Sequence, residues 1–392
     1  MPRDEDQPDL RRDHSDFLLT AGGPFYGVLV GLRLRTAAGL TPRWWFALIP
    51  WVAWAFGEGV QLLLGIPLDP MAYDLSLHVR LVITFPLLLA SEPLLDQTVT
   101  SALRSLYRGA FCDPALLDRT VERAEQLRNS WVVELALLAI AVIGGQLVLW
   151  RVFGSTGLVH GGDATRIWSF TRVWYAFVAL PLFQFVMFRW LWRWSIWAYM
   201  LARISRMELS LLATHADFAC GLAALARPMN GFSGFVLAIG ALLSGAWAAQ
   251  LLGGQTTIRE LAPIAVVFLV AAMAIGAGPL LLFCGHLFRA RRRTLSQYGD
   301  FMRMYVLRFH NKWITSPGSA EPLGTSDIQS LNDLGSAFQV IAKTRLFIFG
   351  PRNVLGIWSA GILPLLPLLA TMLTVEAMLS RIVRIVLGGL PF

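Results

Sequence analysis

The feature that most constrains the fold is an apolar run that begins near Pro263 and ends in a block of arginines. Leucine, isoleucine and phenylalanine prefer the hydrocarbon of a bilayer, whereas arginine is costly there and favourable beside anionic headgroups. The block consists of Arg289, Arg291, Arg292 and Arg293. We therefore predict that a membrane-spanning helix ends here at the cytoplasmic face, with these arginines against anionic lipid headgroups.

The composition of the chain is that of a membrane protein. Hydrophobic residues make up 56% of the 392 residues and charged residues only 15%, whereas soluble domains carry about 25% charged residues. The net charge of +8 comes from arginines that cluster at the ends of apolar spans. The sequence has no recognisable nucleic-acid-binding motif, so we predict a lipid bilayer as partner, no nucleic acid and no cofactor.

Apolar stretches recur seven times along the chain, and a membrane span needs about 20 such residues. This pattern predicts an all-α fold, a polytopic helical membrane bundle with about seven transmembrane helices, six and eight being the alternatives. The expected spans cover about residues 44–64, 80–97, 131–152, 168–188, 232–252, 263–288 and 354–375.

These spans divide the chain into four parts. Arginines are concentrated after the second, fourth and sixth spans, so those loops and the N-terminus are expected to be cytoplasmic. The expected parts are 1–43, a cytoplasmic tail with an interfacial helix; 44–288, a six-helix transmembrane bundle with cytoplasmic loops 98–130 and 189–231; 289–352, a cytoplasmic helical segment; and 353–392, the last transmembrane helix with an amphipathic C-terminus.

Two further patterns bear on how the helices pack. Residues 114–128, 293–309 and 327–343 have apolar side chains at helical spacing, which predicts amphipathic cytoplasmic helices. In the fifth span, Gly240 and Ser244 are four residues apart. Small residues at this spacing let helix backbones approach closely, either within one chain or between copies in a homo-oligomer.

Several motifs resemble those of a family of uncharacterised bacterial multi-pass inner-membrane proteins, and the resemblance covers most of the chain. It implies a bacterial inner-membrane location and no particular activity. The His-Asp motif departs from the family pattern by an alanine at 216 and a cysteine at 220. The motifs are GGPFY at 22–26, THAD at 214–217 running into Gly221-Leu222, RRR at 291–293 with Tyr298-Gly299, and EPLGTSDIQSL at 321–331.

Glu92 and Asp96 are the first candidates for a functional role. They are four residues apart in the second span, so they lie on one helix face. Pro93 follows Glu92, and a proline frees a backbone carbonyl one turn earlier. Carboxylates and free carbonyls on one face can bind a cation or relay protons, which predicts an ion path. The alternative is a helix end whose acids meet water or an arginine.

Glu58 in the first span and Glu134 in the third are further ion-path candidates. Ionisable groups inside a span are costly and usually have a purpose. Either glutamate is expected to pair with Arg80, Arg172 or Arg189. A structural ion pair that locks the bundle is at least as good an explanation as a substrate role.

His215 and Asp217 form a cytoplasmic motif that has two interpretations. Histidine and carboxylate are ligands for divalent metals, with Cys220 or His286 as additional weak candidates. Two ligands two residues apart do not define a metal site, however, and we favour a helix-end cap by Asp217 beside a solvated His215. No metal site is therefore predicted.

Three functions are consistent with these patterns. The first is an ion, proton or small-solute channel or transporter with Glu92 on the path, because several spans are interrupted by proline or glycine. The second is an assembly or sensing protein that docks a partner through its amphipathic cytoplasmic helices. The third is a membrane-embedded enzyme with a metal at His215 and Asp217, although no catalytic motif supports an enzyme.

Overall fold

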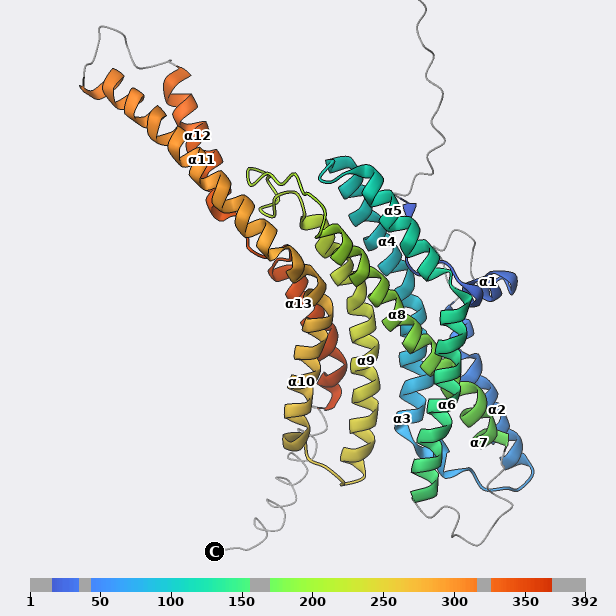
Figure 1. Ribbon diagram of the computed structural model, residues 1–392. Coiled ribbons are helices and arrows are strands. Elements are labelled where there is room, and N and C mark those ends of the chain that lie inside the picture. Colours follow the sequence, from blue (N-terminus) through green and yellow to red (C-terminus); the bar gives the residue numbers. More distant parts are fainter. Residues whose placement is uncertain (1–15, 35–43, 156–169, 316–325, 369–392) are drawn as a thin grey trace, which may run out of the picture.

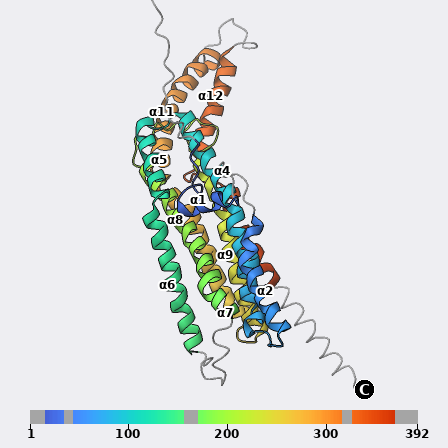
Figure 2. The ribbon, with the colours of Figure 1, turned by 90° about the vertical axis from the view of Figure 1, so that its right-hand side faces the viewer.

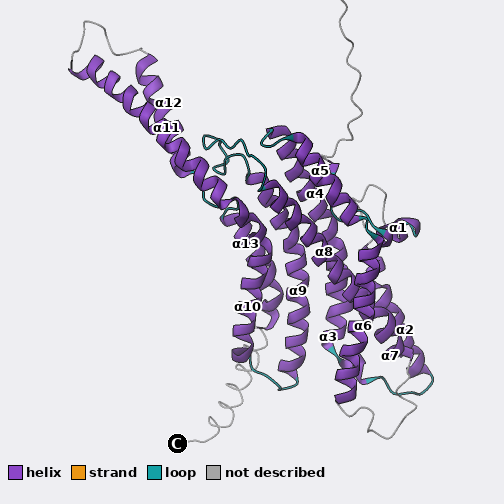
Figure 3. Ribbon diagram, viewed as in Figure 1, coloured by secondary structure: helices purple, strands orange, loops and turns teal. Residues whose placement is uncertain are grey.

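The computed structural model describes residues 16–34, 44–155, 170–315 and 326–368, and all regular elements in these ranges are helices (Figures 1 and 3). Several helices are continued by short 3₁₀ or π-helical segments, which lengthen the rods without a loop. The α-helices are α1 (Pro24–Gly31), α2 (Ile49–Leu63), α3 (Leu75–His78), α4 (Phe85–Gly109), α5 (Pro114–Arg128), α6 (Trp131–Ser155), α7 (Phe170–Trp174), α8 (Leu180–Ile204), α9 (Arg227–Leu252), α10 (Ile258–Ala277), α11 (Cys284–His310), α12 (Ser326–Lys343) and α13 (Pro351–Ile362).

Five helical rods of the described chain are long and apolar enough to cross a membrane. A sixth arises if α5 and α6, bent by 43°, count as one span. The part of the chain that the structure describes is therefore all-helical and has the character of a multi-pass membrane protein. The expected last span, 354–375, is described only as far as Leu368. The five rods are Phe46–Leu63, Leu75–Gly109, Phe170–Ile204, Ala223–Leu252 and Ile258–Thr315.

Helix α9 is the central helix of the bundle, because α4 packs along one side of it and α13 along another. Its glycines make this packing close. A Cβ atom at Gly231 would lie 2.9 Å from the Cα of Leu95, and one at Gly234 would lie 2.5 Å from the Cβ of Ser91. Gly240, one of the small residues that the sequence singles out, also packs within the chain, because a Cβ atom there would lie 3.1 Å from the carbonyl oxygen of Gly361.

The arginine-rich segments gather at one end of the bundle, which we call the arginine-rich end. It contains the last turns of α4, helix α5, residues 205–226 and the start of α11, in the upper half of Figure 1. The connections after α2 and α9 lie at the opposite end. The two expected loops at this end are largely helical, since α4 continues to Gly109 and α8 to Ile204.

The N-terminal part of the described chain is partly inserted into the bundle. Phe17 and Leu19 are buried in the same apolar core as α4 and α8. The chain then turns at Gly23, whose φ of +89° suits glycine. The short helix α1 follows and leaves the bundle (Figure 1). Residues 16–23, which we call the inserted N-terminal segment, therefore enter the bundle before α1 begins.

Helices α11 and α12 form an antiparallel pair that extends beyond the arginine-rich end in both views (Figures 1 and 2). Gly299 and Phe338 face each other in this pair, as do Met302 and Gly335. The hydroxyl of Tyr305 donates a hydrogen bond to the carbonyl of Asp327. We call this pair, Cys284–His310 with Ser326–Lys343, the α11–α12 hairpin.

Candidate functional site

The inserted N-terminal segment is held by Asp96. One carboxylate oxygen of Asp96 accepts a hydrogen bond from the backbone N–H of Thr20 at 2.6 Å, and the other accepts one from its hydroxyl at 2.5 Å. One turn further along α4, the Thr100 hydroxyl donates to the carbonyl of Phe17 at 2.8 Å. Because Asp96 is only 1% exposed, these bonds replace the water that a buried carboxylate would lose.

Two glutamates and two arginines meet inside the bundle, and we call Glu92, Glu134, Arg189 and Arg193 the ionic cluster. Arg189 donates to Glu92 at 2.9 Å and lies 3.4 Å from Glu134. Arg193 also lies 3.4 Å from Glu134. All four residues are at most 5% exposed. Two positive and two negative charges compensate each other, which a buried charge requires.

The ionic cluster also binds the backbone of the inserted segment. Arg189 donates to the carbonyl of Thr20 at 2.8 Å, and Arg193 donates to that of Gly22 at 2.8 Å. Glu134 accepts the backbone N–H of Phe25 at 2.8 Å. Charge-assisted bonds of this kind are stronger than neutral ones. The cluster therefore joins α4, α6 and α8 to the inserted segment and to the first turn of α1.

The structure brings three of the four expected acids together and leaves one apart. Glu92, Asp96 and Glu134 surround the inserted segment, and Glu134 meets Arg189, one of its expected partners. Glu58 lies near the other end of the bundle, where it accepts the backbone N–H of Asp69 at 3.0 Å. Arg172 pairs with Asp69 instead of Glu58.

Arg189 and Arg193 fall at the start of the expected cytoplasmic loop 189–231, yet both are buried inside the bundle. They stand in a run of tryptophans and arginines, 188–194, which is typical of a belt at the membrane surface. Their side chains are only 1% and 2% exposed. The spacing of four residues was the available signal, because it places both arginines on one helix face.

Asp217 organises a tight turn between α8 and α9. Its carboxylate accepts the backbone N–H groups of Ala219, Gly221 and Ala223 at 2.9 to 3.0 Å. Burial opposes its ionisation, but these three hydrogen bonds outweigh burial and lower the pKa of Asp217 below its ordinary value. The bond from Ala223 holds the first residue of the helical turn Ala223–Ala226, whereas the other two bonds lie within the loop.

His215 lies beside Asp217, with Nδ1 2.9 Å from a carboxylate oxygen. Within the described ranges, no three His, Cys, Asp or Glu side chains are grouped so that they could hold a metal ion. Cys220 is buried, and burial together with the nearby Asp217 raises the pKa of its thiol to about 11. The thiol is therefore protonated and unreactive at neutral pH.

The same turn supports the base of the hairpin. Arg345, just after α12, donates its backbone N–H to the carbonyl of Phe218 at 2.8 Å and its guanidinium to that of Asp217 at 2.9 Å. The buried hydroxyl of Thr344 donates to the carbonyl of Ala213 at 3.1 Å. The position of the hairpin is thus tied to the Asp217 turn.

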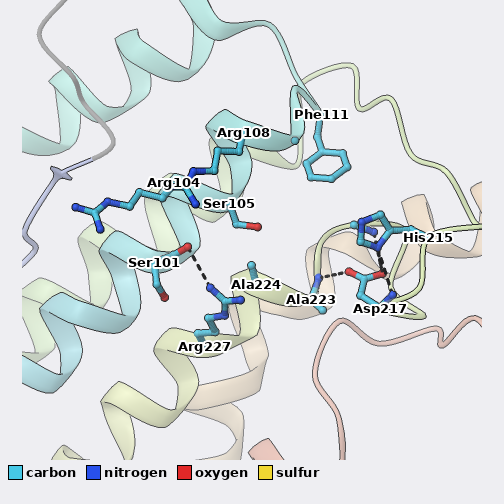
Figure 4. Close-up of a pocket in the computed structure, with 12 residues that line it drawn as sticks. Ser101, Arg104, Ser105, Arg108, Phe111, His215, Asp217, Ala223, Ala224 and Arg227 are labelled. Atoms are coloured by element: carbon cyan, nitrogen blue, oxygen red, sulfur yellow. Dashed lines mark hydrogen bonds and ion pairs between the residues drawn. The ribbon is translucent and has the colours of Figure 1, made fainter.

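A cavity of about 560 Å³ opens beside this turn (Figure 4). Its walls come from the last turns of α4, the 215–221 turn and the start of α9, and they carry three arginines, namely Arg104, Arg108 and Arg227. Asp217 is the one acidic residue among the lining residues of this cavity. The cavity is therefore predominantly cationic, a feature that the sequence analysis did not identify.

The arginine block of α11 divides into an internal and an external part. Arg291 donates to the carbonyl of Ala342 at 2.7 Å and so binds the end of α12. Arg289 donates to Gly285 within its own helix, while Arg292 and Arg293 are exposed. Arginine near a helix C-terminus also complements the helix dipole.

The fold and these sites define a multi-pass helical membrane protein with a buried ionic cluster and a cationic cavity at its arginine-rich end. No family model, curated protein or solved structure matches the chain.

Proposed function

We propose that this protein is a bacterial inner-membrane protein, with seven spans and a cytoplasmic N-terminus, that docks a soluble partner on its α11–α12 hairpin. The observation that carries the proposal is an apolar stripe on α11. Phe301, Met304 and Leu307 are spaced by three residues, and their exposed fractions are 53%, 54% and 53%. They lie outside the face that meets α12, where Gly299 and Met302 are in contact.

The charge of α11 indicates what kind of surface would cover this stripe. The helix carries six arginines and a single acidic residue, Asp300. Exposed Arg303 and Arg308 border the stripe. Because like charges repel, a second copy of this basic face is a poor partner, whereas an apolar surface bordered by carboxylates is complementary.

The position of the hairpin favours a soluble partner over the bilayer. The hairpin extends past the rest of the arginine-rich end in both views (Figures 1 and 2). A stripe this far along α11 is well placed for contact with the cytoplasm. The exposed Arg292 and Arg293, near the base of the hairpin, are the residues we assign to anionic lipid headgroups.

Site-specific photo-crosslinking in intact cells tests this proposal. A photoreactive residue at Met304 is expected to give one adduct with a soluble protein. The same residue at Asn332, which is exposed on α12, is the matched control and is expected to give none. An adduct between two copies of the chain, an adduct with lipid alone, or equal yields at both positions would exclude a soluble partner at the stripe.

The partner identified in this way must also bind through the predicted chemistry. Purified partner is expected to bind the detergent-solubilised chain at least about tenfold more weakly after Leu307→Glu. Binding is also expected to weaken between about 0.1 M and about 0.5 M salt, because the rim contacts are ionic. Affinity that is insensitive to both changes would refute the assignment of the stripe.

Transport is the second candidate function, and one observation favours it. Two π-helical segments, Val79–Thr84 and Tyr175–Ala179, interrupt spans of the bundle, and Arg80 in the first donates to the hydroxyl of Tyr175 in the second. π-helical segments often mark functional sites. Flux measured in liposomes with wild type and Glu92→Gln tests this candidate, since loss of flux with retained stability would place Glu92 on the path.

A further inference from the structure

The cationic cavity at the arginine-rich end has the size of a ligand site. Its volume of about 560 Å³ lies within the range of about 300–1,000 Å³ that small-molecule sites occupy. Figure 4 shows side chains of Arg108, Ser105 and Arg227 on one side and the Asp217 turn on the other. These groups come from distant parts of the chain, so the tertiary fold assembles the cavity.

The arginines of the cavity retain capacity to bind an anion. A guanidinium has five N–H donors. Arg227 donates one of them to the carbonyl of Ser101 at 3.3 Å, and Arg104 forms an exposed ion pair with Asp16. No residue that the structure describes forms an ion pair with Arg108. Its charge is therefore available to a ligand.

The single carboxylate in the wall does not cancel this charge. Asp217 already accepts three backbone N–H groups and lies beside His215, so its negative charge is held by the turn. The helical rod Ala223–Leu252 also starts at this cavity, with Ala223 and Ala224 in the wall. The first N–H of this rod, that of Ala223, is already bound by Asp217, so the arginines are the groups that would bind an anion.

The other wall of the cavity is aromatic. The rings of Phe111 and His215 are 6.4 Å apart at their centroids and meet edge to face, and both line the cavity. An apolar or planar part of a ligand can pack against such rings. The site thus combines a cationic region with a neighbouring aromatic surface.

We propose that this cavity binds an anionic phosphate group, with Arg108 and Arg227 as its principal contacts. Planar guanidinium groups match phosphate oxygens in pairs. The phosphate can belong to a lipid headgroup or to a soluble phosphate compound, since both offer the same chemistry. The proposal is independent of the docking function assigned to the hairpin.

Ligand binding measured on the full chain tests this proposal. The protein is placed in nanodiscs of neutral phosphatidylcholine and titrated with pyrophosphate by calorimetry. In a parallel arm, native mass spectrometry counts the anionic phosphatidylglycerol molecules that the chain retains from a mixed bilayer. Binding in the first arm identifies a soluble phosphate compound as the source, and binding in the second arm alone identifies a lipid headgroup.

The variants decide whether the cavity is responsible. Arg108→Gln with Arg227→Gln is expected to reduce binding at least about tenfold, because two charge-assisted contacts are lost. Arg119→Gln changes an exposed arginine on α5 outside the cavity and is expected to bind as wild type does. Ser105→Asp leaves all arginines in place, adds a negative charge to the wall, and is expected to abolish binding.

Each variant is first shown to be folded by gel filtration and thermal unfolding. If the double variant does not fold, Ser105→Asp carries the test alone. Failure of wild type to bind either probe would overturn the proposal. So would wild-type affinity in the double variant or in Ser105→Asp.

Discussion

Replacing Arg189 with methionine gives the sharpest test of the ionic cluster. The change removes the partner of Glu92 at 2.9 Å and the donor to the carbonyl of Thr20 at 2.8 Å. Losing one partner of a buried ion pair costs about 3–5 kcal/mol, because the remaining buried charge loses compensation. A lost charge-assisted bond of about 1.5–3 kcal/mol and an orphaned carbonyl of about 1–3 kcal/mol lead to the same range.

We therefore expect Arg189→Met to destabilise the protein by about 4 kcal/mol, close to a thousandfold in the folding equilibrium. Reversible unfolding in mixed micelles, with a denaturing detergent as the variable, measures this change. Arg119→Met on the surface of α5 is the matched control, and a change within about 0.5 kcal/mol is expected there.

A second variant separates charge from packing. Adding Glu92→Met to Arg189→Met is expected to restore part of the loss, because an apolar pair of similar size needs no compensating charge. An Arg189→Met protein within about 1 kcal/mol of wild type would refute the structural role of the cluster. A double variant no more stable than the single one would show that removing the Arg189 charge from beside Glu92 is not the source of the loss.

Three more predictions concern packing, pH and thiol chemistry. Gly234→Ala is expected to destabilise the chain by about 1–3 kcal/mol in the same unfolding assay, whereas Gly144→Ala, whose Cβ meets no described atom within 4 Å, is expected to be neutral or slightly stabilising. The folded-state pKa of Asp217 is lowered. Its contribution to the free energy of unfolding is therefore complete above about pH 5 and is lost as the pH falls through about 4 toward the folded-state pKa. The free energy of unfolding of Asp217→Asn, measured against pH, is expected to lack this loss. Cys220 is fully buried and its thiol has a pKa of about 11. It is expected to resist maleimide at about pH 7.5 in the folded protein and to react only after unfolding, whereas the half-buried Cys112 is expected to react before it.

The helical class and most span positions could be predicted from hydropathy, because a bilayer imposes both the length and the polarity of each span. The grouping of arginine-rich segments at one end follows from the same argument, and Figure 1 shows that grouping. The number of spans was harder to predict. The pattern counts seven apolar runs, whereas five to six described rods meet the criteria for a span, and the seventh run extends past Leu368.

Burial of charge could not be predicted from single segments. Hydropathy predicts that the span ends at Arg189 and Arg193, because it depends on the residues of one helix and not on the neighbouring helices that supply the partners. Their partners Glu92 and Glu134 are 97 and 59 residues away. The cavity could not be predicted for the same reason, since Arg108 and Arg227 are brought together only by the packing of α4 on α9.

The ionic cluster determines how a flux experiment with Glu92→Gln must be interpreted. The amide keeps an oxygen that can accept from Arg189, but it leaves the cluster with two positive charges against Glu134 alone. Such an imbalance inside a bundle weakens the fold even where no ion passes. Loss of flux therefore supports a path through Glu92 only if unfolding shows the variant intact. Loss of flux that merely parallels loss of stability would instead show that Glu92 has a structural role in the ionic cluster, which joins α4 and α8 to the inserted N-terminal segment.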